Sequence, residues 1–231
     1  LPYLPAGPGR LVLDVGAGQG YFSRILKDRG YAVDACDAQL ENFRCPDVPF
    51  LKADLNRSIP CADGRYDAVI SIETIEHIED HFRFMGEIVR VTKPGGVIVI
   101  TTPNILSLTS RWHFFLYGYT DCAPFPIEPG RPDYFMEHIN PIGLPEVLFH
   151  LERHGADLTA LATNRMRRSA WIPCLILYPL LALSLRRKLL RGRYRDREAL
   201  HRRHLRWMLH PANLLGRITI AVAHRRSGAP V

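Results

Sequence analysis

Short runs of consecutive apolar residues alternate with longer amphipathic stretches along most of the chain. A run of about four to eight apolar residues is typical of a strand that is covered on both faces of a sheet. An apolar residue at every third or fourth position is typical of a helix with one buried face. These patterns predict strands over residues 11–15, 31–36, 49–53, 66–72, 97–101, 156–163 and 217–223, and helices over 21–29, 80–92 and 140–154.

The order of these elements predicts a single α/β domain. Strands that alternate with helices through short turns form a doubly wound, mostly parallel sheet with helices on both faces. The Lys-Pro-Gly-Gly sequence at 93–96 predicts a turn before the strand at 97–101. The 231 residues, 47% of them apolar, suffice for one core with a small appendage and not for two full-sized domains.

Two stretches fall outside this alternation. Residues 105–137 are rich in aromatic residues and proline, and we expect an irregular substrate loop or lid there. Residues 165–212 are expected to form a basic amphipathic helical insertion before the last strand, so that 1–164 and 213–231 make up the main domain. Inside this insertion, residues 170–185 carry no charge, are interrupted by two prolines, and are too few for a bilayer span of about 20 apolar residues. We expect a segment that lies in the membrane interface, with a buried or dimer-forming helix pair as the alternative.

Charge is divided unevenly along the chain. The net charge of +7 is the balance of −7 over residues 1–164 and +14 over residues 165–231. The basic part predicts a solvated surface, contact with an anionic membrane or, with less weight, contact with RNA. The five cysteines are scattered without a CxxC pair, and residues 1–9 lack the pattern of a signal peptide. We therefore expect a cytoplasmic protein. If the insertion binds lipid, we expect the protein to be peripheral at the inner face of the membrane.

The densest candidate site follows the first strand, in the sequence VLDVGAGQGYF at 12–22. Asp14 lies in the strand, and the alternating glycines Gly16, Gly18 and Gly20 allow a sharp turn and a close approach of a ligand to the backbone. The dinucleotide fingerprint G-x-G-x-x-G needs a glycine where this chain has Tyr21. The loop therefore favours a ligand with a charged amino-acid end and no phosphates.

Acidic residues follow the second and third strands. Asp37 comes 21 residues after Gly16, and its two carboxylate oxygens can accept hydrogen bonds from both hydroxyls of a ribose. Asp54 follows the third strand and can accept from an adenine amino group. Parallel strands place their carboxyl ends at one edge of the sheet, where α/β proteins bind ligands, so we expect a nucleoside there.

With these residues the sequence resembles the class I methyltransferases that use S-adenosylmethionine. The resemblance covers roughly residues 10–164 and 213–224 and rests on the glycine loop, the two acids and the Lys-Pro-Gly-Gly turn. It implies a Rossmann-like fold of seven strands in the order 3-2-1-4-5-7-6, with the last strand antiparallel. It also implies S-adenosylmethionine contacts from Asp14, Gly16, Ala17, Gly18, Gly20, Asp37, Asp54, Leu55 and Ile72.

A second constellation follows the fourth strand. If Glu73 opens a helical turn, Glu76 and His77 share its face, and two carboxylates beside an imidazole need a compensating charge such as a divalent cation. Mixed oxygen and nitrogen ligands suit Mg, Mn, Fe or Zn. The pattern is similar to the Glu-x-x-Glu-His of the small-RNA 3′-end 2′-O-methyltransferases and of the ubiquinone-pathway O-methyltransferases. That resemblance implies metal ligands at Glu73, Glu76, His77 and His138.

The same side chains have simpler interpretations. Glu76 and His77 are candidate catalytic residues without a metal, with His77 as a general base, or they only cap the turn. A metal across two adjacent hydroxyls would lower the pKa of one of them and position it for attack on the sulfonium methyl. Residues 101–118 resemble, more loosely, methyltransferases found among bacterial cell-surface glycan enzymes. The aromatic residues of that stretch either stack on a substrate ring or pack the lid, among them Trp112, Phe114 and Tyr117.

Three functions compete on these features. The first is O-methylation of a vicinal diol or catechol-like hydroxyl, on a lipid-linked saccharide or another membrane-associated small molecule. The second is RNA 2′-O-methylation, with the basic segment on the nucleic-acid backbone. The third is a non-catalytic scaffold that binds the cofactor or a membrane, against which the complete glycine loop and both acids argue. The acceptor, the metal and the oligomeric state stay open.

Overall fold

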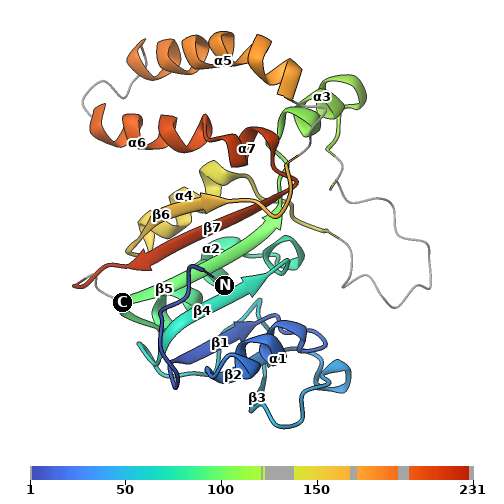
Figure 1. Ribbon diagram of the computed structural model, residues 1–231, viewed down its shortest axis with the longest axis vertical. Helices are drawn as coiled ribbons and strands as arrows, with labels where there is room; N and C mark the ends of the chain where they lie inside the picture. Colours follow the sequence, from blue (N-terminus) through green and yellow to red (C-terminus); the bar gives the residue numbers. More distant parts are fainter. Residues whose placement is uncertain (1, 121, 123–137, 167–170, 192–197, 229–231) are drawn as a thin grey trace.

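The structure, a computed structural model, describes residues 2–120, 122, 138–166, 171–191 and 198–228. These residues form a seven-stranded sheet in the order β3-β2-β1-β4-β5-β7-β6, in which β7 is antiparallel to both of its neighbours and the other pairs are parallel (Figure 1). The predicted fold, strand order and antiparallel last strand are confirmed. The strands are β1 (Leu11–Val15), β2 (Ala32–Asp37), β3 (Phe50–Lys52), β4 (Tyr66–Ile72), β5 (Thr92–Pro103), β6 (Ala156–Ala162) and β7 (Ile218–Arg225).

Helices cover both faces of the sheet. Neighbouring strand residues point to opposite faces, so Val12 packs in the core with α1 while Leu13 packs in the core with α2 and α4. The strands are mainly apolar because both of these faces are buried. The helices are α1 (Tyr21–Asp28), α2 (His81–Val91), α3 (Leu108–Tyr117), α4 (Leu144–Arg153), α5 (Trp171–Arg191), α6 (Glu198–Met208) and α7 (Pro211–Leu215), with short 3-10 turns η1 (Leu40–Asn42) and η2 (Ile75–His77).

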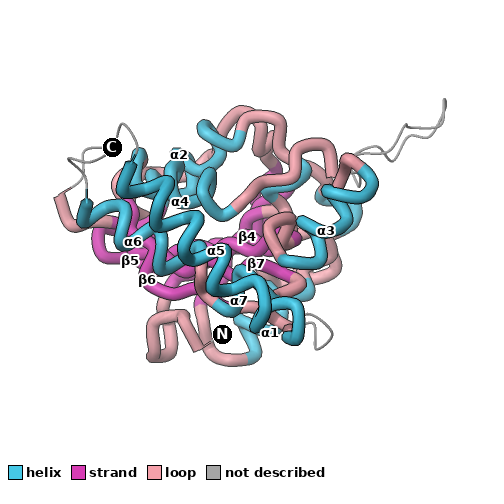
Figure 2. The backbone as a smooth tube through the Cα atoms, turned by 90° about the horizontal axis from the view of Figure 1, so that it is seen from above, coloured by secondary structure: helices cyan, strands magenta, loops and turns pink. Residues whose placement is uncertain are grey.

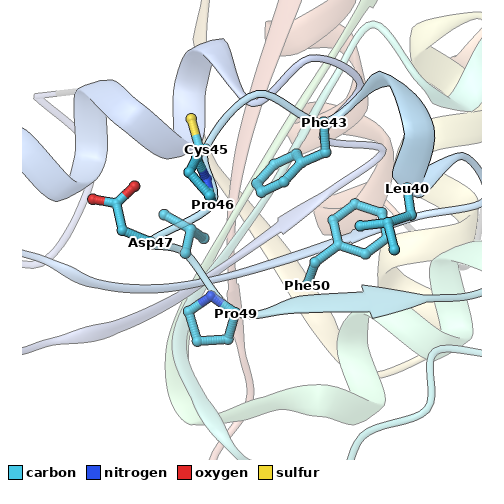
Figure 3. A pocket seen from close by; sticks show the side chains of 8 residues that line it. Leu40, Phe43, Cys45, Pro46, Asp47, Pro49 and Phe50 are labelled. Atoms are coloured by element: carbon cyan, nitrogen blue, oxygen red, sulfur yellow. The ribbon is translucent and has the colours of Figure 1, made fainter.

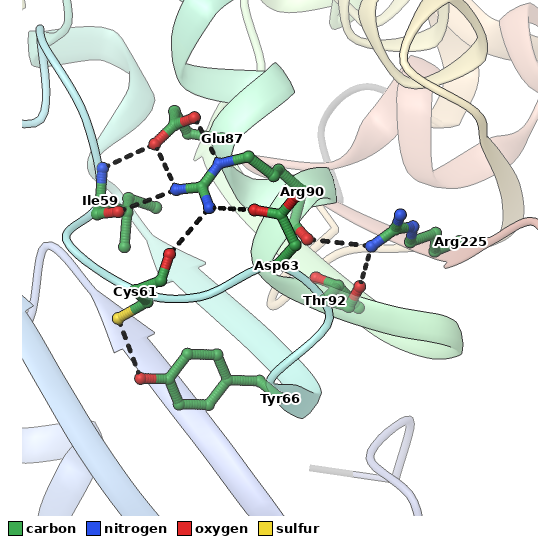
Figure 4. Close-up of polar contacts among 8 residues, drawn as sticks. All are labelled: Ile59, Cys61, Asp63, Tyr66, Glu87, Arg90, Thr92 and Arg225. Carbon is green, nitrogen blue, oxygen red and sulfur yellow. Dashed lines mark hydrogen bonds and ion pairs between the residues drawn. The ribbon is translucent and has the colours of Figure 1, made fainter. Parts of the chain in front are cut away.

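A polar network closes the sheet at the amino ends of β4 and β5 (Figure 4). The Arg90 guanidinium, near the end of α2, donates to the carboxylates of Glu87 and Asp63 and to two backbone carbonyls of the connection before β4. Arg225 of β7 donates to the carbonyls of Arg90 and Thr92 at 2.9 and 2.6 Å. This network connects α2 to β7 at the end of the sheet opposite to the glycine loop. The carboxyl ends of β1 and β4 lie at the other end and take no part in it.

Helices α5, α6 and α7 form a further layer beside β6 and β7, with α5 outermost (Figures 1 and 2). Asn104, just after β5, joins this layer to the sheet. Its Nδ2 lies 2.9 Å from the carbonyl of Asn213 and 3.0 Å from that of Gly216, and its Oδ1 accepts from the Leu106 N–H. The predicted helical segment before the last strand is therefore present, although residues 167–170 and 192–197 of it lie outside the described chain.

The prediction of an irregular stretch over 105–137 is wrong for residues 108–117, which form α3. Ser107 caps this helix by accepting from the Ser110 N–H at 3.1 Å, and Gly118 ends it in the left-handed conformation with φ 77°. These local capping residues outweigh the aromatic composition. Residues 121 and 123–137 of that stretch are outside the described part.

Two further predictions of local structure are wrong. Residues 93–96 lie inside β5 as an irregularity between the pairs Tyr66–Thr92 and Ala68–Val97, because the pairing of Thr92 starts the strand before them. Pro179 does not interrupt α5. Its exposed position lets water reach the carbonyl that the proline leaves without an N–H partner. No helix in the described part of the chain is long and apolar enough to span a bilayer.

Candidate functional site

The glycine loop connects β1 to α1 at the open edge of the sheet. The N–H groups of Gly16 and Ala17 donate to the Cys36 carbonyl of β2 at 2.8 and 3.2 Å. A Cβ at Gly16 would lie 2.2 Å from Thr74 Oγ1, so the loop and the segment after β4 touch here. A Cβ at Gly18 would meet nothing within 4 Å. The loop is thus fixed by packing at Gly16 and open to a ligand at Gly18.

Asp37 lies directly beside this open position. Its Oδ2 accepts from the Gly18 N–H at 2.9 Å and its Oδ1 from the Gln39 N–H at 3.1 Å. A carboxylate has about four acceptor positions, so both oxygens can still accept from ribose hydroxyls. Asp54, after β3, is exposed, accepts from the Asn56 N–H at 3.0 Å and pairs with Arg57. These contacts hold the two acids at the strand ends without using all of their capacity.

The other residues predicted to bind the cofactor differ in exposure. Leu55 is buried, and Ile72, the last residue of β4, is half-buried at the same edge. Asp14 is 2% exposed and accepts from the Ser23 hydroxyl at 2.6 Å. This hydrogen bond connects β1, which precedes the glycine loop, to α1, which follows it. Burial raises the pKa of Asp14 to about 6. The glycine loop, Asp37, Asp54 and Ile72 therefore form one edge that fits a nucleoside with an amino-acid tail.

A shallow hollow of about 530 Å³ lies beside the loop (Figure 3). Phe43 and Cys45 form part of its wall, and both also contact Gly20, where a Cβ would lie 2.7 Å from the Phe43 ring. The lining is mainly apolar and includes neither Asp37 nor Asp54. The hollow is therefore separate from the acidic residues of the predicted cofactor site.

The structure brings three of the four predicted metal ligands together. Glu76, His77 and His138 each offer one ligand atom, and these atoms all lie within 4.8 Å of one another. The rings of His77 and His138 are 5.1 Å apart. Glu76 is 1% exposed, and neither of its carboxylate oxygens has a hydrogen bond of normal geometry to the described residues. Burial raises its pKa to about 7, and the negative charge of Glu73 adds to the rise.

Glu73 does not join this cluster. The expectation that Glu73 opens a helical turn is wrong, because its φ is 50° and the 3-10 turn η2 starts two residues later at Ile75. Its carboxylate accepts from the Thr101 hydroxyl at 2.8 Å, and its N–H donates to the same hydroxyl at 3.0 Å. Burial also raises the pKa of Glu73. The left-handed backbone turns this side chain toward β5 rather than toward His138.

Two residues that the sequence analysis gave no role hold the cluster in place. Thr74 donates from its hydroxyl to the Val15 and Ile72 carbonyls at 3.3 and 3.2 Å, which fixes η2 against the glycine loop. The Asn140 N–H donates to the Glu76 carbonyl at 3.0 Å, and its amide donates to the carbonyls of residues 78 and 79. An Asn before Pro141 is a turn signal that pointed to this position.

The cluster fits a divalent cation by its chemistry. A buried carboxylate without hydrogen-bond partners is costly unless a positive charge or a proton compensates it. One carboxylate and two imidazoles are a donor set that Mn, Fe and Zn accept. The same arrangement also fits a metal-free general base, since a carboxyl group with a pKa of about 7 exchanges protons near neutrality.

The sheet order and the helices on both faces make a Rossmann-like fold of the kind seen in methyltransferase structures. Residues 13–100 match the family described as "Methyltransferase domain". This part of the chain, which holds the glycine loop, is thus similar to a methyltransferase domain. The structure is similar to an S-adenosylmethionine-dependent methyltransferase of Mesorhizobium loti, with a TM-score of 0.59 and 17% identity over 97% of this chain and 94% of the other, a likeness of fold.

Curated relatives are similar to part of the chain. A demethylmenaquinone methyltransferase of Beutenbergia cavernae is 35% identical over 127 residues, 52% of each chain. A ubiquinone biosynthesis O-methyltransferase of Caulobacter vibrioides is 30% identical over 105 residues, 42% of each chain. The chain thus spans about half or less of the length of the curated relatives it matches.

Proposed function

We propose that this protein transfers a methyl group from S-adenosylmethionine to a hydroxyl oxygen of a small-molecule or lipid-linked acceptor. The observation that carries the proposal is the position of Glu76, His77 and His138. Their ligand atoms lie within 4.8 Å of one another. Glu76 and His77 follow β4 together with Thr74, which contacts the glycine loop at Gly16. Proton-accepting groups therefore stand next to the expected methyl donor.

In this proposal the cofactor is bound by the backbone of the glycine loop and by the carboxylates of Asp37 and Asp54. S-adenosylmethionine supplies an electrophilic methyl group on a sulfonium. In our proposal the open face at Gly18 receives the methionine part, and the Asp37 oxygens accept from the ribose hydroxyls. Asp54 accepts from the adenine amino group, and Ile72 and Leu55 contact the ring. The exposure of Asp54 and the free acceptor positions of Asp37 support these assignments.

The acceptor hydroxyl has to lose its proton as its oxygen attacks. The oxygen–carbon bond forms while the sulfur–carbon bond breaks, and the proton passes to Glu76 or His77. Glu76 is suited to this because its carboxylate has no hydrogen bond of normal geometry to the described residues. The same three side chains would hold a divalent cation, and a bound cation supplies a lower pKa to a coordinated hydroxyl.

The name of one relative supports an oxygen acceptor. The Caulobacter protein is named an O-methyltransferase of ubiquinone biosynthesis. The name of the Beutenbergia protein, a demethylmenaquinone methyltransferase, states no oxygen acceptor. A vicinal diol or catechol-like hydroxyl is the acceptor that two imidazoles and a carboxylate suit best, since they can bind or deprotonate adjacent hydroxyls.

The test separates cofactor binding from transfer. Calorimetry should detect S-adenosylmethionine binding, which Asp37→Ala weakens by at least about tenfold through the loss of one charged acceptor. Glu76→Gln should keep the affinity and lower methyl transfer by about a hundredfold or more. Asp47→Ala, an exposed acid paired with Lys27, is the matched control and should change neither quantity.

Transfer is measured with methyl-labelled cofactor on catechols, extracted lipid-linked saccharides and RNA. Label on an oxygen of a catechol or saccharide supports the proposal, and loss of turnover after chelation assigns a metal to the cluster. Turnover that is unchanged in Glu76→Gln would remove the cluster from the reaction. Label on RNA alone would contradict the proposed acceptor while leaving methyl transfer intact.

A further inference from the structure

Helix α5 is apolar on two opposite faces. Cys174 and Leu181 face inward and pack with Leu108, Leu214 and Leu215 of α3 and α7. At 100° per residue, Ile176, Leu180 and Leu183 lie on the opposite side of the helix. These three side chains are 67%, 64% and 47% exposed. The inner face explains how α5 attaches to the domain, whereas the three outer side chains are exposed among the residues that the structure describes.

Helix α3 carries further exposed apolar side chains. Its first residue, Leu108, packs in the same cluster as Cys174 of α5, and Figure 1 shows the start of α5 beside α3. Trp112 and Phe115 stack with ring centres 5.8 Å apart and are 59% and 77% exposed. We call the exposed side chains of Ile176, Leu180, Leu183, Trp112 and Phe115 the α5–α3 apolar surface. Several large apolar side chains exposed on neighbouring helices are typical of a protein or membrane contact.

Exposed cations border this surface. Arg186 and Arg187 are exposed near the end of α5, and Arg187 lies one helical turn after Leu183 on the same side. Residues 165–231 carry a net charge of +14. An apolar stripe that ends in arginines, with tryptophan at its border, is the pattern of a helix that lies in the plane of a membrane interface.

We propose that the α5–α3 apolar surface docks this protein on an anionic lipid bilayer. The apolar side chains enter the boundary of the acyl chains, and Arg186 and Arg187 remain among the anionic headgroups. A second copy is a poorer occupant, because it would bring the same cations against one another. The proposal is independent of the reaction proposed above, since it requires neither cofactor nor acceptor.

Vesicle flotation tests the proposal with the whole chain. The protein should float with vesicles of phosphatidylcholine and phosphatidylglycerol and should bind pure phosphatidylcholine vesicles much more weakly. Ile176→Glu/Leu180→Glu should lower the partition coefficient by more than about a hundredfold, since it places two charges in the boundary. Arg186→Gln/Arg187→Gln should lower it by about 30-fold on the anionic vesicles only.

Leu40→Glu is the matched control, because Leu40 is an exposed apolar residue at the β3 end of the sheet, far from α5. It should float like the unchanged protein, and all variants should keep the melting temperature because the substituted side chains are exposed. Failure of the unchanged protein to float would overturn the proposal, and so would flotation of Ile176→Glu/Leu180→Glu. A dimer in sedimentation that this double variant converts to a monomer would assign the surface to a second copy instead.

Discussion

Two regions of this protein use apolar residues for different purposes. In β1 to β5 the strands are covered by helices on both faces, and residues such as Val12, Leu13 and Ile98 are fully buried. In α5 the inner face is buried at Cys174, while Leu180 on the outer face is 64% exposed. Apolar residues thus build a closed core in one region and an open surface in the other.

Charge separates the same two regions. The net charge is −7 over residues 1–164 and +14 over residues 165–231. In residues 1–164, Asp37 and Asp54 lie at the edge of the sheet where we expect a nucleoside with a sulfonium. The rear region directs exposed arginines outward beside apolar side chains. The two proposed contacts, with a sulfonium nucleoside and with an anionic bilayer, need opposite charges, which one chain can supply in separate segments.

The largest effect is expected in the front region, at Gly16. Gly16→Ala should lower S-adenosylmethionine affinity by about a hundredfold and destabilise the fold by about 2–4 kcal/mol. The reasons are a φ of 74° and a new Cβ that would overlap Thr74 Oγ1 at 2.2 Å. Calorimetry and urea unfolding measure the two quantities.

Gly18→Ala is the control for Gly16→Ala. Gly18 also has a positive φ, 51°, but a Cβ there meets no atom within 4 Å. In urea unfolding it should therefore show only the conformational cost of about 1 kcal/mol. Equal destabilisation by both variants would show that the contact between Gly16 and Thr74 has no energetic importance.

The next effect concerns the junction between the two regions, at Asn104. Asn104→Ala leaves the Gly216 and Asn213 carbonyls without their buried donor and should destabilise the protein by about 2–3 kcal/mol. Amide hydrogen exchange should rise in α7 and stay unchanged in β1. Asn42→Ala, an exposed control in η1, should change stability by less than about 0.5 kcal/mol. Uniform exchange across both regions would contradict a local junction.

The smallest effect is the pH dependence contributed by Asp14. Its pKa in the folded protein is about 6, above its value of 3.8 without burial, so the folded state binds more protons between these values. Stability should therefore fall as the pH rises from 4 to 6. Asp14→Asn keeps an acceptor for Ser23 and should stabilise the protein without cofactor by about 1–2 kcal/mol at pH 8, with little gain at pH 4.

Urea unfolding at the two pH values measures this dependence. Asp47→Asn serves as the control of opposite sign, because the hydrogen bond from Lys27 lowers the pKa of Asp47. Its contribution to stability is present above its ordinary pKa and is lost as the pH falls, so removing it should give no gain at pH 8. A gain from Asp14→Asn that is independent of pH would contradict the assigned pKa.

The strands of the sheet could be predicted from the sequence because the patterns that indicate a strand are local. Mainly apolar runs predicted all seven strands. The glycines and acids at the strand ends predicted a cofactor site at one edge of the sheet, which stays a prediction. Local signals were misread at α3, where capping by Ser107 and Gly118 was overlooked, and at 93–96, where pairing with Tyr66 extends β5. The strand order came from resemblance to a family rather than from the periodicity of the residues.

The amino-acid pattern alone established a doubly wound α/β domain, its glycine loop, and an uncharged segment followed by cations. Folding in three dimensions decided that Glu73 turns to Thr101 while Glu76 meets His138, residues far apart in the chain. It also decided which side of α5 faces outward. The physical reason is that periodicity reports which residues prefer burial, whereas the partner of each side chain depends on backbone geometry and on contacts between distant segments.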